Sequence, residues 1–335
     1  MKIPENENSV ENLIYKTYEE KVELPRSHMG CSLIGHKCER YLWLNFRWVT
    51  IKKHPGRLLK LFKRGHNEET TVIRDLRNIG VDIRGTQTKV EFGKHVGGSL
   101  DGIVMSGLPF APKSKAVLEC KTHSDKSFQE LKKKGVKEAK FQHYIQMQSY
   151  MIGTKLDRAL YYAVNKNDDE IYTEWVHLDK EQAERYVLRA QSIAMQESIP
   201  APISTDPSWY ECKICDYHEF CHNTKTLTNV SCRSCAHVTP LEDSTWKCER
   251  YDAPIPLDAQ YSGCDAHAIH PELVPYEFKP GKDIWHAIYI INGKDVVNGA
   301  DGFKSREIVA NPAECAEPCE MTKQLKEMMD VEIVG

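Results

Sequence analysis

The distribution of cysteine divides this chain into two parts that must be stabilised in different ways. Seven of the twelve cysteines in the 335-residue chain fall between residues 212 and 264, and only three lie in the first 211 residues. The Cys-rich segment has modest apolar content, so it needs a staple beyond its own core. In a reducing compartment that staple is a metal before it is a disulfide. We therefore expect one sizeable apolar core and a smaller metal-held module.

Composition narrows the class of protein. Hydrophobic residues make up 41% of the chain and charged residues 28%, which is typical of a globular protein and not of a disordered one. The net charge is −3, so a uniformly basic coat for nucleic acid is excluded and any such binding must use local patches. No run of 18 apolar residues and no apolar signal segment is present, and we expect a cytoplasmic protein without a membrane span.

Hydrophobic periodicity predicts alternating helices and strands over residues 26–223. We expect an α/β fold in which a mixed sheet is flanked by helices. We expect a polar, poorly structured lead-in over residues 1–25, a core domain over 26–225, and a Cys-rich module with a C-terminal hairpin over 226–335. Turn residues at Asn292-Gly293 mark that hairpin. The predicted core elements are a helix over 58–79, strands over 95–105 and 115–122, a helix over 141–151, strands over 158–164 and 170–178, and a helix over 180–196.

The most specific chemistry lies on two neighbouring predicted strands, 97–103 and 116–122. Side chains alternate along a strand, so Glu119 and Lys121 share one face while Leu118 and Cys120 point to the other. Pairing of the two strands brings Asp101 beside Glu119. Two carboxylates held this close need a cation between them, and oxygen ligands suit Mg²⁺ or Mn²⁺. The Cys120 side chain is expected to be a buried apolar group.

The order Asp101, then Glu119-x-Lys121 after a hairpin connection, resembles the PD-(D/E)XK nuclease superfamily. Gln146 and Tyr150 lie on one face of a predicted helix and resemble the Gln-x-x-x-Tyr motif of its RecB-like and YqaJ-like branch. An ordinary amphipathic helix would carry the same residues by chance. The resemblance covers about residues 26–223 and implies a restriction-endonuclease-like sheet.

The resemblance also assigns roles to individual residues. A helix-borne ligand four residues after Gly65 would be Glu69, with His66 and Glu68 as nearby competitors. The metal would be held by Glu69, Asp101, Glu119 and the backbone carbonyl of Cys120. Lys121 would position the attacking water, and Gln146 and Tyr150 would steady the scissile phosphate or Lys121.

The first cysteine set is split by the predicted core. Cys212-x2-Cys215-x5-Cys221 supplies three thiolates, and Cys38 is the best candidate for a fourth, with Cys31 as the alternative. This arrangement resembles the AddB-like and CRISPR-associated iron–sulfur exonucleases, which implies a structural [4Fe–4S] cluster. Zinc could fill the same thiolates.

The second set is Cys232-x2-Cys235-x12-Cys248-x15-Cys264, which is consistent with a closed structural Zn²⁺ site. His237 or His267 could replace one of these cysteines. Reduced thiols without metal would show the same spacing. Cys315 and Cys319 form a pair with no visible partner and stay unassigned.

Two groups of residues are candidates for substrate contacts. Lysines between the Glu-x-Lys strand and the Gln helix could pair with phosphates, although a solvated loop is the plainer interpretation. Aromatic and cationic side chains near Cys38 would suit an unpaired strand, although the tryptophans could equally be core. The two groups are Lys126, Lys132, Lys133, Lys134, Lys137 and Lys140, and Arg40, Trp43, Arg47 and Trp48.

Together these features indicate an Mg²⁺- or Mn²⁺-dependent DNA exonuclease. By analogy it would act in phage or mobile-element recombination, in a bacterial host cytoplasm, with a single-strand annealing protein or a helicase as partner. The alternatives are a structure-specific endonuclease with the same site and a non-catalytic iron–sulfur or zinc scaffold that binds DNA. The oligomeric state is not predicted.

Overall fold

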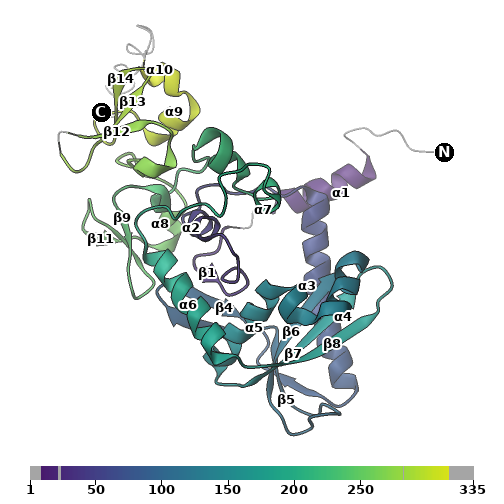
Figure 1. Ribbon diagram of the computed structural model, residues 1–335. Helices are drawn as coiled ribbons and strands as arrows, with labels where there is room; N and C mark the ends of the chain where they lie inside the picture. The colour runs from purple at the N-terminus through teal and green to yellow at the C-terminus, as the bar shows by residue number, and fades with distance from the viewer. Residues whose placement is uncertain (1–8, 22–23, 282, 317–335) are drawn as a thin grey trace, which may run out of the picture. The chain divides into compact units, whose positions relative to one another are not determined.

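The computed structural model describes residues 9–21, 24–281 and 283–316. The chain forms two compact units (Figure 1). Unit 1 comprises residues 1–37, 52–194 and 242–244, and unit 2 comprises residues 38–51, 195–241 and 245–335. Cys38 and both cysteine sets therefore belong to unit 2, whereas Asp101, Glu119 and Lys121 belong to unit 1.

Unit 1 is built on a five-stranded sheet with the order β2-β5-β6-β7-β8. Only β6 and β7 are parallel, and the other neighbours are antiparallel. The mixed sheet predicted from the sequence is confirmed. Its strands are β2 (Asp82–Arg84), β5 (Gly102–Ser106), β6 (Ala116–His123), β7 (Arg158–Asn165) and β8 (Ile171–His177).

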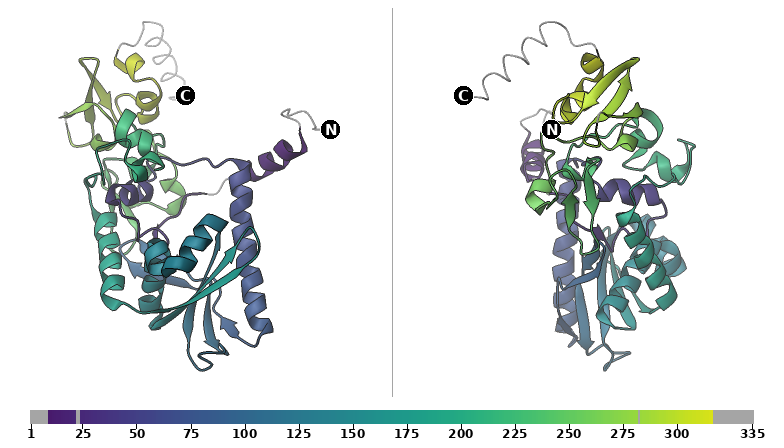
Figure 2. Two further views of the ribbon diagram at one scale, coloured as in Figure 1. Left: turned by 45° about the vertical axis from the view of Figure 1, so that its right-hand side comes forward. Right: turned by 90° about the vertical axis from the view of Figure 1, so that its left-hand side faces the viewer.

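Helices cover both faces of this sheet (Figure 2). On one face, α3 (Gly56–Asn78) places Val72 and Leu76 against a core that includes Leu118 and Cys120. The Cys120 side chain is thus buried, as expected. The other face carries α4 (Asp125–Ala139) and α5 (Phe141–Thr154), and α6 (Lys180–Met195) follows β8. Because β6 is covered on both faces, Glu119 is buried completely.

The expected single strand over 97–103 is wrong, because the chain breaks there between two sheets. Residues 96–99 form β4 (Val96–Ser99), which pairs with β1 (Met29–Gly30) and β3 (Lys89–Gly93) in a separate sheet. The backbone of Leu100 bonds to Gln87 and Thr88 instead of to β6. Asp101 therefore sits at the junction between the two sheets, immediately before β5.

The lead-in is also more ordered than predicted. Helix α1 (Val10–Glu19) begins at Ser9, whose hydroxyl accepts a hydrogen bond from the amide of Asn12 at 3.3 Å. Its other end is tied to α3, because the Gly56 amide donates to the Glu19 carboxylate at 2.5 Å. The rest of the predicted lead-in, residues 1–8 and 22–23, lies outside the described residues.

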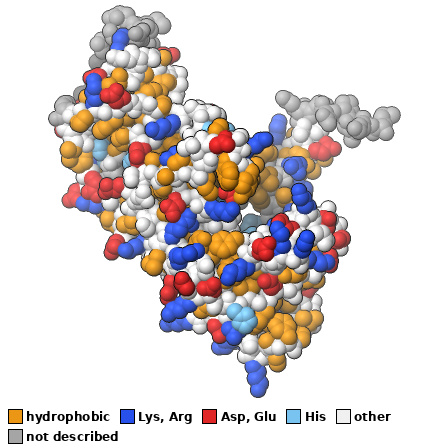
Figure 3. Space-filling view, in the orientation of Figure 1, with side chains coloured by type: hydrophobic (Ala, Val, Ile, Leu, Met, Phe, Trp, Pro, Cys, Tyr) orange, Lys and Arg blue, Asp and Glu red, His pale blue; other side chains and the backbone are white. Residues whose placement is uncertain are grey.

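The lysine-rich segment is a helix, not a loop. Helix α4 bends at Gly135, where φ is +73°, and most of its lysines pair with carboxylates. Figure 3 shows the resulting mixture of blue and red side chains over this part of the surface. Such exposed pairs dilute the positive patch that the sequence suggested. The pairs are Lys132 with Glu170, Lys134 with Glu130 and Glu138, Lys137 with Asp179, and Lys140 with Glu130.

Unit 2 contains short elements and two three-stranded sheets, with orders β11-β10-β9 and β12-β13-β14. The hairpin across Asn292-Gly293 is confirmed, and both residues have positive φ, as a tight two-residue turn requires. Its elements are α2 (Glu39–Phe46), α7 (Tyr210–Lys213), β9 (Val238–Pro240), β10 (Trp246–Cys248), β11 (Ala253–Pro254), α8 (Leu257–Gln260), β12 (Glu277–Pro280), β13 (Ala287–Ile291), β14 (Lys294–Asn298), α9 (Ser305–Ala310) and α10 (Pro312–Ala316).

The aromatic and cationic residues near Cys38 form the core of unit 2 and not a nucleic-acid surface. Trp43, Arg47 and Trp48 are all at most 2% exposed. The Arg47 guanidinium lies 4.8 Å from the Trp43 ring, and Trp48 stacks on Tyr261. Arg40 donates to the carbonyl of Pro200 at 2.7 Å. The substrate-contact hypothesis is therefore wrong for Trp43, Arg47 and Trp48, whereas Arg40 is only partly buried. None of the helices within the described ranges is long and apolar enough to cross a membrane.

Candidate active site

The site lies where β5 and β6 separate. The two strands pair up to Gly102 and Leu118. Asp101 immediately precedes β5, and Glu119 is the next residue on β6. Beyond that pair the Asp101 carboxylate takes the place of a strand partner, because it accepts the Cys120 amide hydrogen at 2.7 Å. Burial raises the pKa of Asp101, and the Lys121 ammonium and the Cys120 amide oppose this shift. The predicted proximity of Asp101 to the Glu119-x-Lys121 strand is present.

Glu119 and Lys121 form an ion pair on one face of β6. Burial, which Lys121 only partly offsets, raises the pKa of Glu119 to about 8. Burial opposes the charge on Lys121, but Glu119 and Asp101 outweigh it and raise the pKa of the ammonium. The Glu119 Oε2 atom is buried and has no hydrogen-bond partner among the described residues. Such an unmet acceptor is costly without a cation or a donor to satisfy it.

Glu69 is a residue of α3 and interacts electrostatically with Asp101. Burial, then the neighbouring Asp101 carboxylate, raises its pKa, while His66 and Lys121 lower it. Glu68 and His66 line the same cavity as Glu69, so the structure keeps all three candidates near the site. No group of three or more His, Cys, Asp or Glu side chains within the described ranges is arranged to hold a metal ion as it stands.

The donor set nevertheless fits a divalent cation. Lys121 pairs with one oxygen of Glu119, and the other oxygen has no partner among the described residues. Burial, and then the Asp101 and Glu69 carboxylates, raises the pKa of Glu119. Carboxylate oxygens are the ligands that Mg²⁺ and Mn²⁺ prefer. The N–H and C=O of one strand residue point to the same edge, so the Cys120 carbonyl faces the side where Asp101 lies.

Gln146 and Tyr150 lie on α5 and are both buried. The Tyr150 hydroxyl donates to the carbonyl of Ser99 at 2.8 Å, which anchors the segment that leads into Asp101. Gly98 makes this approach possible, since a Cβ there would lie 2.7 Å from the Tyr150 hydroxyl oxygen. The Gln146 Oε1 atom is buried without a hydrogen-bond partner in the described part of the chain. The role that the structure supports for Tyr150 is to position Asp101.

A further polar network beside the site was missed by the sequence analysis. The Tyr161 hydroxyl lies 2.9 Å from His123 Nε2 and 2.9 Å from His143 Nδ1, and Ser127 Oγ lies 3.1 Å from His123 Nδ1. Tyr161 pairs with Glu119 in the β6–β7 register. The signal was available, because the alternation that places Glu119 and Lys121 on one face also places His123 there.

The four cysteines of the first set all lie in unit 2, but within the described ranges no three of them are placed to hold a metal ion as they stand. Burial is the main cause that raises the pKa values of Cys212, Cys215 and Cys221, and Cys38 adds to each shift. The Cys215 amide donates to the Cys212 carbonyl at 3.0 Å, which closes the Cys-x2-Cys turn. Tyr217 then donates its amide hydrogen to Cys215 Sγ at 3.4 Å. Cys31, the alternative fourth ligand, is buried in unit 1.

The second cysteine set has the same closed Cys-x2-Cys turn and the same kind of amide hydrogen bond to sulfur. Burial raises the pKa of Cys232 to about 11, with Cys264 and Cys248 as further causes. The Cys235 amide donates to the Cys232 carbonyl at 3.0 Å, and the His237 amide donates to Cys235 Sγ at 3.5 Å. An amide donor to sulfur favours the thiolate, but burial outweighs it and raises the pKa of Cys235. No disulfide joins the eleven cysteines that the structure describes.

His237 and His267, the two possible replacements for a cysteine ligand, make hydrogen bonds to other residues. His267 bonds through both ring nitrogens, at 2.7 Å to Ser305 and at 2.9 Å to the Ser231 carbonyl, and His237 Nε2 lies 3.1 Å from the Trp285 carbonyl oxygen. The structure therefore gives no support to either histidine as a metal ligand. Cys315 is buried, and Cys319 lies outside the described residues.

Comparison with known proteins gives weak matches. No family model and no curated protein matches the chain. Among solved structures, the protein SSO0001 has a TM-score of 0.41 at 15% identity and covers 64% of this chain and 98% of its own. LHK-Exo in complex with dAMP has a TM-score of 0.35 at 12% identity, covering 54% of this chain and 89% of its own.

A second structure of LHK-Exo, an alkaline exonuclease from Laribacter hongkongensis, has a TM-score of 0.34 at 13% identity. It covers 53% of this chain and 90% of its own. Similarities of this size do not decide function, so the assignment of this chain has to come from the geometry of its own site.

Proposed function

We propose that this chain is a metal-dependent deoxyribonuclease that hydrolyses phosphodiester bonds from DNA ends, with Mg²⁺ or Mn²⁺ as cofactor. One observation carries the proposal. A fully buried Glu119 keeps one carboxylate oxygen unmet beside Asp101 and Lys121, and Lys121 and Glu69 line a cavity of about 760 Å³. A buried carboxylate oxygen without a partner costs folding free energy, and such a group beside a cavity is typical of a catalytic site.

The proposed roles follow from position. Glu69, Asp101, Glu119 and the Cys120 carbonyl would hold the cation. When bound, the cation would polarise the phosphoryl oxygen and make water more acidic. Lys121 remains protonated beside two carboxylates, so it acts as a fixed positive charge that orients water and the phosphate. Tyr150 holds Asp101 in place through Ser99.

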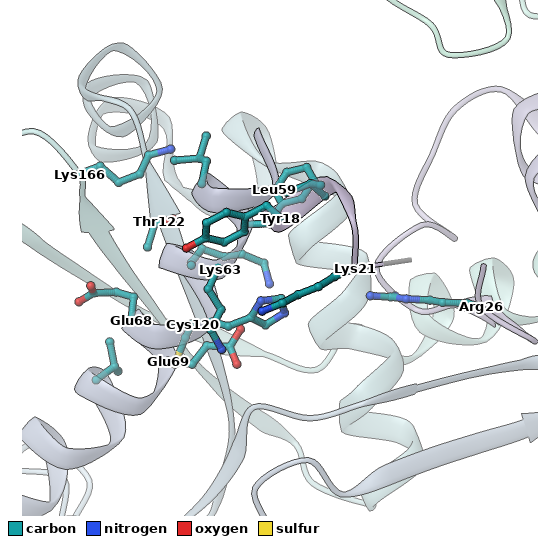
Figure 4. A pocket seen from close by; sticks show the side chains of 16 residues that line it. Tyr18, Lys21, Arg26, Leu59, Lys63, Glu68, Glu69, Cys120, Thr122 and Lys166 are labelled. Carbon is teal, nitrogen blue, oxygen red and sulfur yellow. The ribbon is translucent and has the colours of Figure 1, made fainter. Parts of the chain in front are cut away.

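The cavity walls support an anionic polymer as substrate. Cationic side chains from separate elements face this space (Figure 4). They would compensate the charge of successive phosphates and make binding sensitive to salt. The cations that line the cavity are Lys21, Arg26, Lys63, Lys121 and Lys166.

Linear and closed circular DNA, each with Mg²⁺ or Mn²⁺, test the proposal. We expect degradation of end-labelled linear DNA and no change in the circle. Lys121→Ala should abolish cleavage, while Lys133→Ala, an exposed lysine on α4, should not. Nicking of the circle would instead identify an endonuclease. Absence of cleavage on both substrates would support the non-catalytic scaffold.

We further propose that each cysteine set holds a structural metal. Cys38, Cys212, Cys215 and Cys221 would carry a [4Fe–4S] cluster, and Cys232, Cys235, Cys248 and Cys264 would carry Zn²⁺. The support is the closed Cys-x2-Cys turn and the amide donor to sulfur in each set. Anaerobic protein should be brown, with absorbance near about 400 nm, and should contain zinc. Colourless protein with zinc alone would remove the iron–sulfur assignment.

A further inference from the structure

The cavity that contains Lys121 and Glu69 also contains an aromatic side chain that the proposed chemistry does not use. Tyr18 reaches into it from α1, next to Lys21 (Figure 4). Tyr18 is half-buried, and α1 contains no buried residue, so α1 is not retained for an apolar core of its own. Helix α1 and the residues just after it instead present one ring, Tyr18, and one cation, Lys21, to the cavity that holds the candidate catalytic groups.

Helix α1 is held firmly enough for Tyr18 to act as a fixed surface. The Gly56 amide bonds to Glu19, one residue beyond Tyr18. Gly56 also lets the backbone of Tyr15 approach closely, since a Cβ at Gly56 would clash with the Tyr15 carbonyl. These contacts fix the last turn of α1 against the start of α3, and they set the position of Tyr18 relative to Glu69 on the same long helix.

The surroundings of the Tyr18 ring are cationic. Lys21 Nζ and Lys60 Nζ lie 6.0 Å and 5.9 Å from its centroid, and Lys63 lines the same cavity one helical turn beyond Leu59. An aromatic ring flanked by cations is the combination that binds unpaired nucleotides, because a base stacks on the ring while its phosphates meet the ammonium groups.

The shape of the space points the same way. A cavity of about 760 Å³ is within the range that holds one small ligand, which corresponds to very few nucleotides. A base inside a duplex has both faces covered by its neighbours, so it offers no face to Tyr18 until it is unstacked. A second cavity, lined by Arg74, Arg77 and Asp101, shares Glu69 with the first, so the space available to a strand continues past Glu69 to Asp101.

We infer that Tyr18, with Lys21 and Lys63, forms a stacking subsite for an unpaired base next to the phosphate that is cleaved, and that the enzyme therefore acts on single-stranded DNA or on unpaired ends. This inference rests on the proposed nuclease function. It assigns to α1 a role in substrate selection that is separate from the carboxylates and from both cysteine sets.

The test measures binding without cleavage. Fluorescence anisotropy in Ca²⁺ would compare the full chain with Tyr18→Ala, Tyr18→Phe and Tyr18→Trp on a single-stranded oligonucleotide and a blunt duplex. Tyr18→Ala should weaken single-strand binding on the order of tenfold, the size of one base–aromatic contact, and leave duplex binding unchanged. The Phe and Trp variants should bind like the original protein, which also excludes loss of the tyrosine hydroxyl as the cause.

An abasic substrate makes the test specific. One abasic residue, moved stepwise along the oligonucleotide, should weaken binding to the original protein by the same factor at one position only. At that position Tyr18→Ala should show no further loss, because the two changes remove one contact. Independent losses, or wild-type binding by Tyr18→Ala, would overturn the inference. Cleavage in Mg²⁺ is scored separately, so DNA cleavage with no effect of Tyr18 removes only this subsite, and an inactive protein removes the nuclease proposal.

Discussion

Unit 1 and unit 2 each bring together groups that would repel one another when ionised, but they hold them by different means. In unit 1 the carboxylates of Asp101 and Glu119 sit on a sheet covered on both faces, and Lys121 supplies a compensating charge from the protein itself. In unit 2 the cysteines lie on tight turns and on strands of two or three residues. Under our proposal that each cysteine set holds a metal, we expect the first arrangement to persist without a metal and the second to depend on one.

The carboxylates of unit 1 and the cysteines of unit 2 also differ in how deeply they are buried. Cys120 belongs to a large apolar core together with Leu118 and Leu160, and Glu119 lies between Leu118 and Cys120 on the same strand. Cys264 is exposed, and Cys232, Cys235 and Cys248 are only partly buried. A metal would therefore act as a reagent in unit 1 and as part of the fold in unit 2. Each of the following measurements tests that contrast.

Removal of the metal from unit 2 should give the largest effect. A structural Zn²⁺ contributes on the order of 10 kcal/mol to folding, which exceeds the stability of most domains. Chelation, or Cys235→Ser, should make unit 2 sensitive to limited proteolysis while residues 52–194 stay resistant. Cys120→Ser, in the core of unit 1, is the matched control and should leave the protease pattern of unit 2 intact. An unchanged pattern after complete metal loss would contradict the contrast.

Glu119→Gln should separate activity from stability in unit 1. The amide cannot bind a divalent cation as the carboxylate does, so cleavage should fall by about 10²- to 10⁴-fold. Burial disfavours the charged form of Glu119, so the neutral amide should leave the thermal unfolding midpoint unchanged or raise it. Glu138→Gln, at an exposed position on α4, should change neither quantity. A midpoint lowered by more than about 5 °C would show that the ionised carboxylate supports the fold.

Acid should destabilise both units through buried neutral histidines. Burial lowers the pKa of His123 and of His267 to about 4, below the ordinary value of 6.5. The unfolded chain therefore binds these protons first, so stability is full above about pH 6.5 and falls as the pH drops toward 4. Denaturant unfolding should show this slope, and His123→Gln should flatten it for unit 1. A pH-independent stability over this window would refute the assignment of neutral buried rings.

Tyr150→Phe should give the smallest effect. It removes one hydrogen bond to Ser99, worth about 1 kcal/mol, and loosens the segment that ends in Asp101. We expect a several-fold rise in the Mn²⁺ concentration needed for half-maximal cleavage and little change in stability. Tyr144→Phe, whose hydroxyl interacts with Asp179 and Lys137 and not with Ser99, is the control on the same helix. Equal effects of the two variants would remove the positioning role.

Local patterns accounted for much of unit 1. Alternation on one strand was enough to place Glu119 and Lys121 together, and the turn before β6 brought Asp101 to them. The break at Leu100 was not visible, because the residues on both sides of it favour strands and the choice of partner sheet depends on the distant strand β1 as well as on neighbouring β3. Helix α1 was missed because its stability comes from α3 and not from its own composition.

Unit 2 was less accessible to prediction. Trp43 and Arg47 have the composition of a nucleic-acid surface, yet Arg47 contacts Trp246 and Arg233 and Trp43 contacts His270, all about 200 residues away in the chain. Cysteine spacing indicated which thiols group together, since spacing within a turn is local. It could not show that His267 is held by Ser305 and Ser231, a contact that only the folded chain creates.

The junction between the two sheets of unit 1 has a mechanical consequence. Asp101 follows β4 of one sheet and precedes β5 of the other, while Glu119 is fixed in the interior of the larger sheet. A small rotation of one sheet against the other therefore changes the separation of the two carboxylates without disturbing either strand. Met29 and Val96 pair with each other in the smaller sheet and not with β5 or β6. Repacking these two residues would nevertheless change the separation of the Asp101 and Glu119 carboxylates.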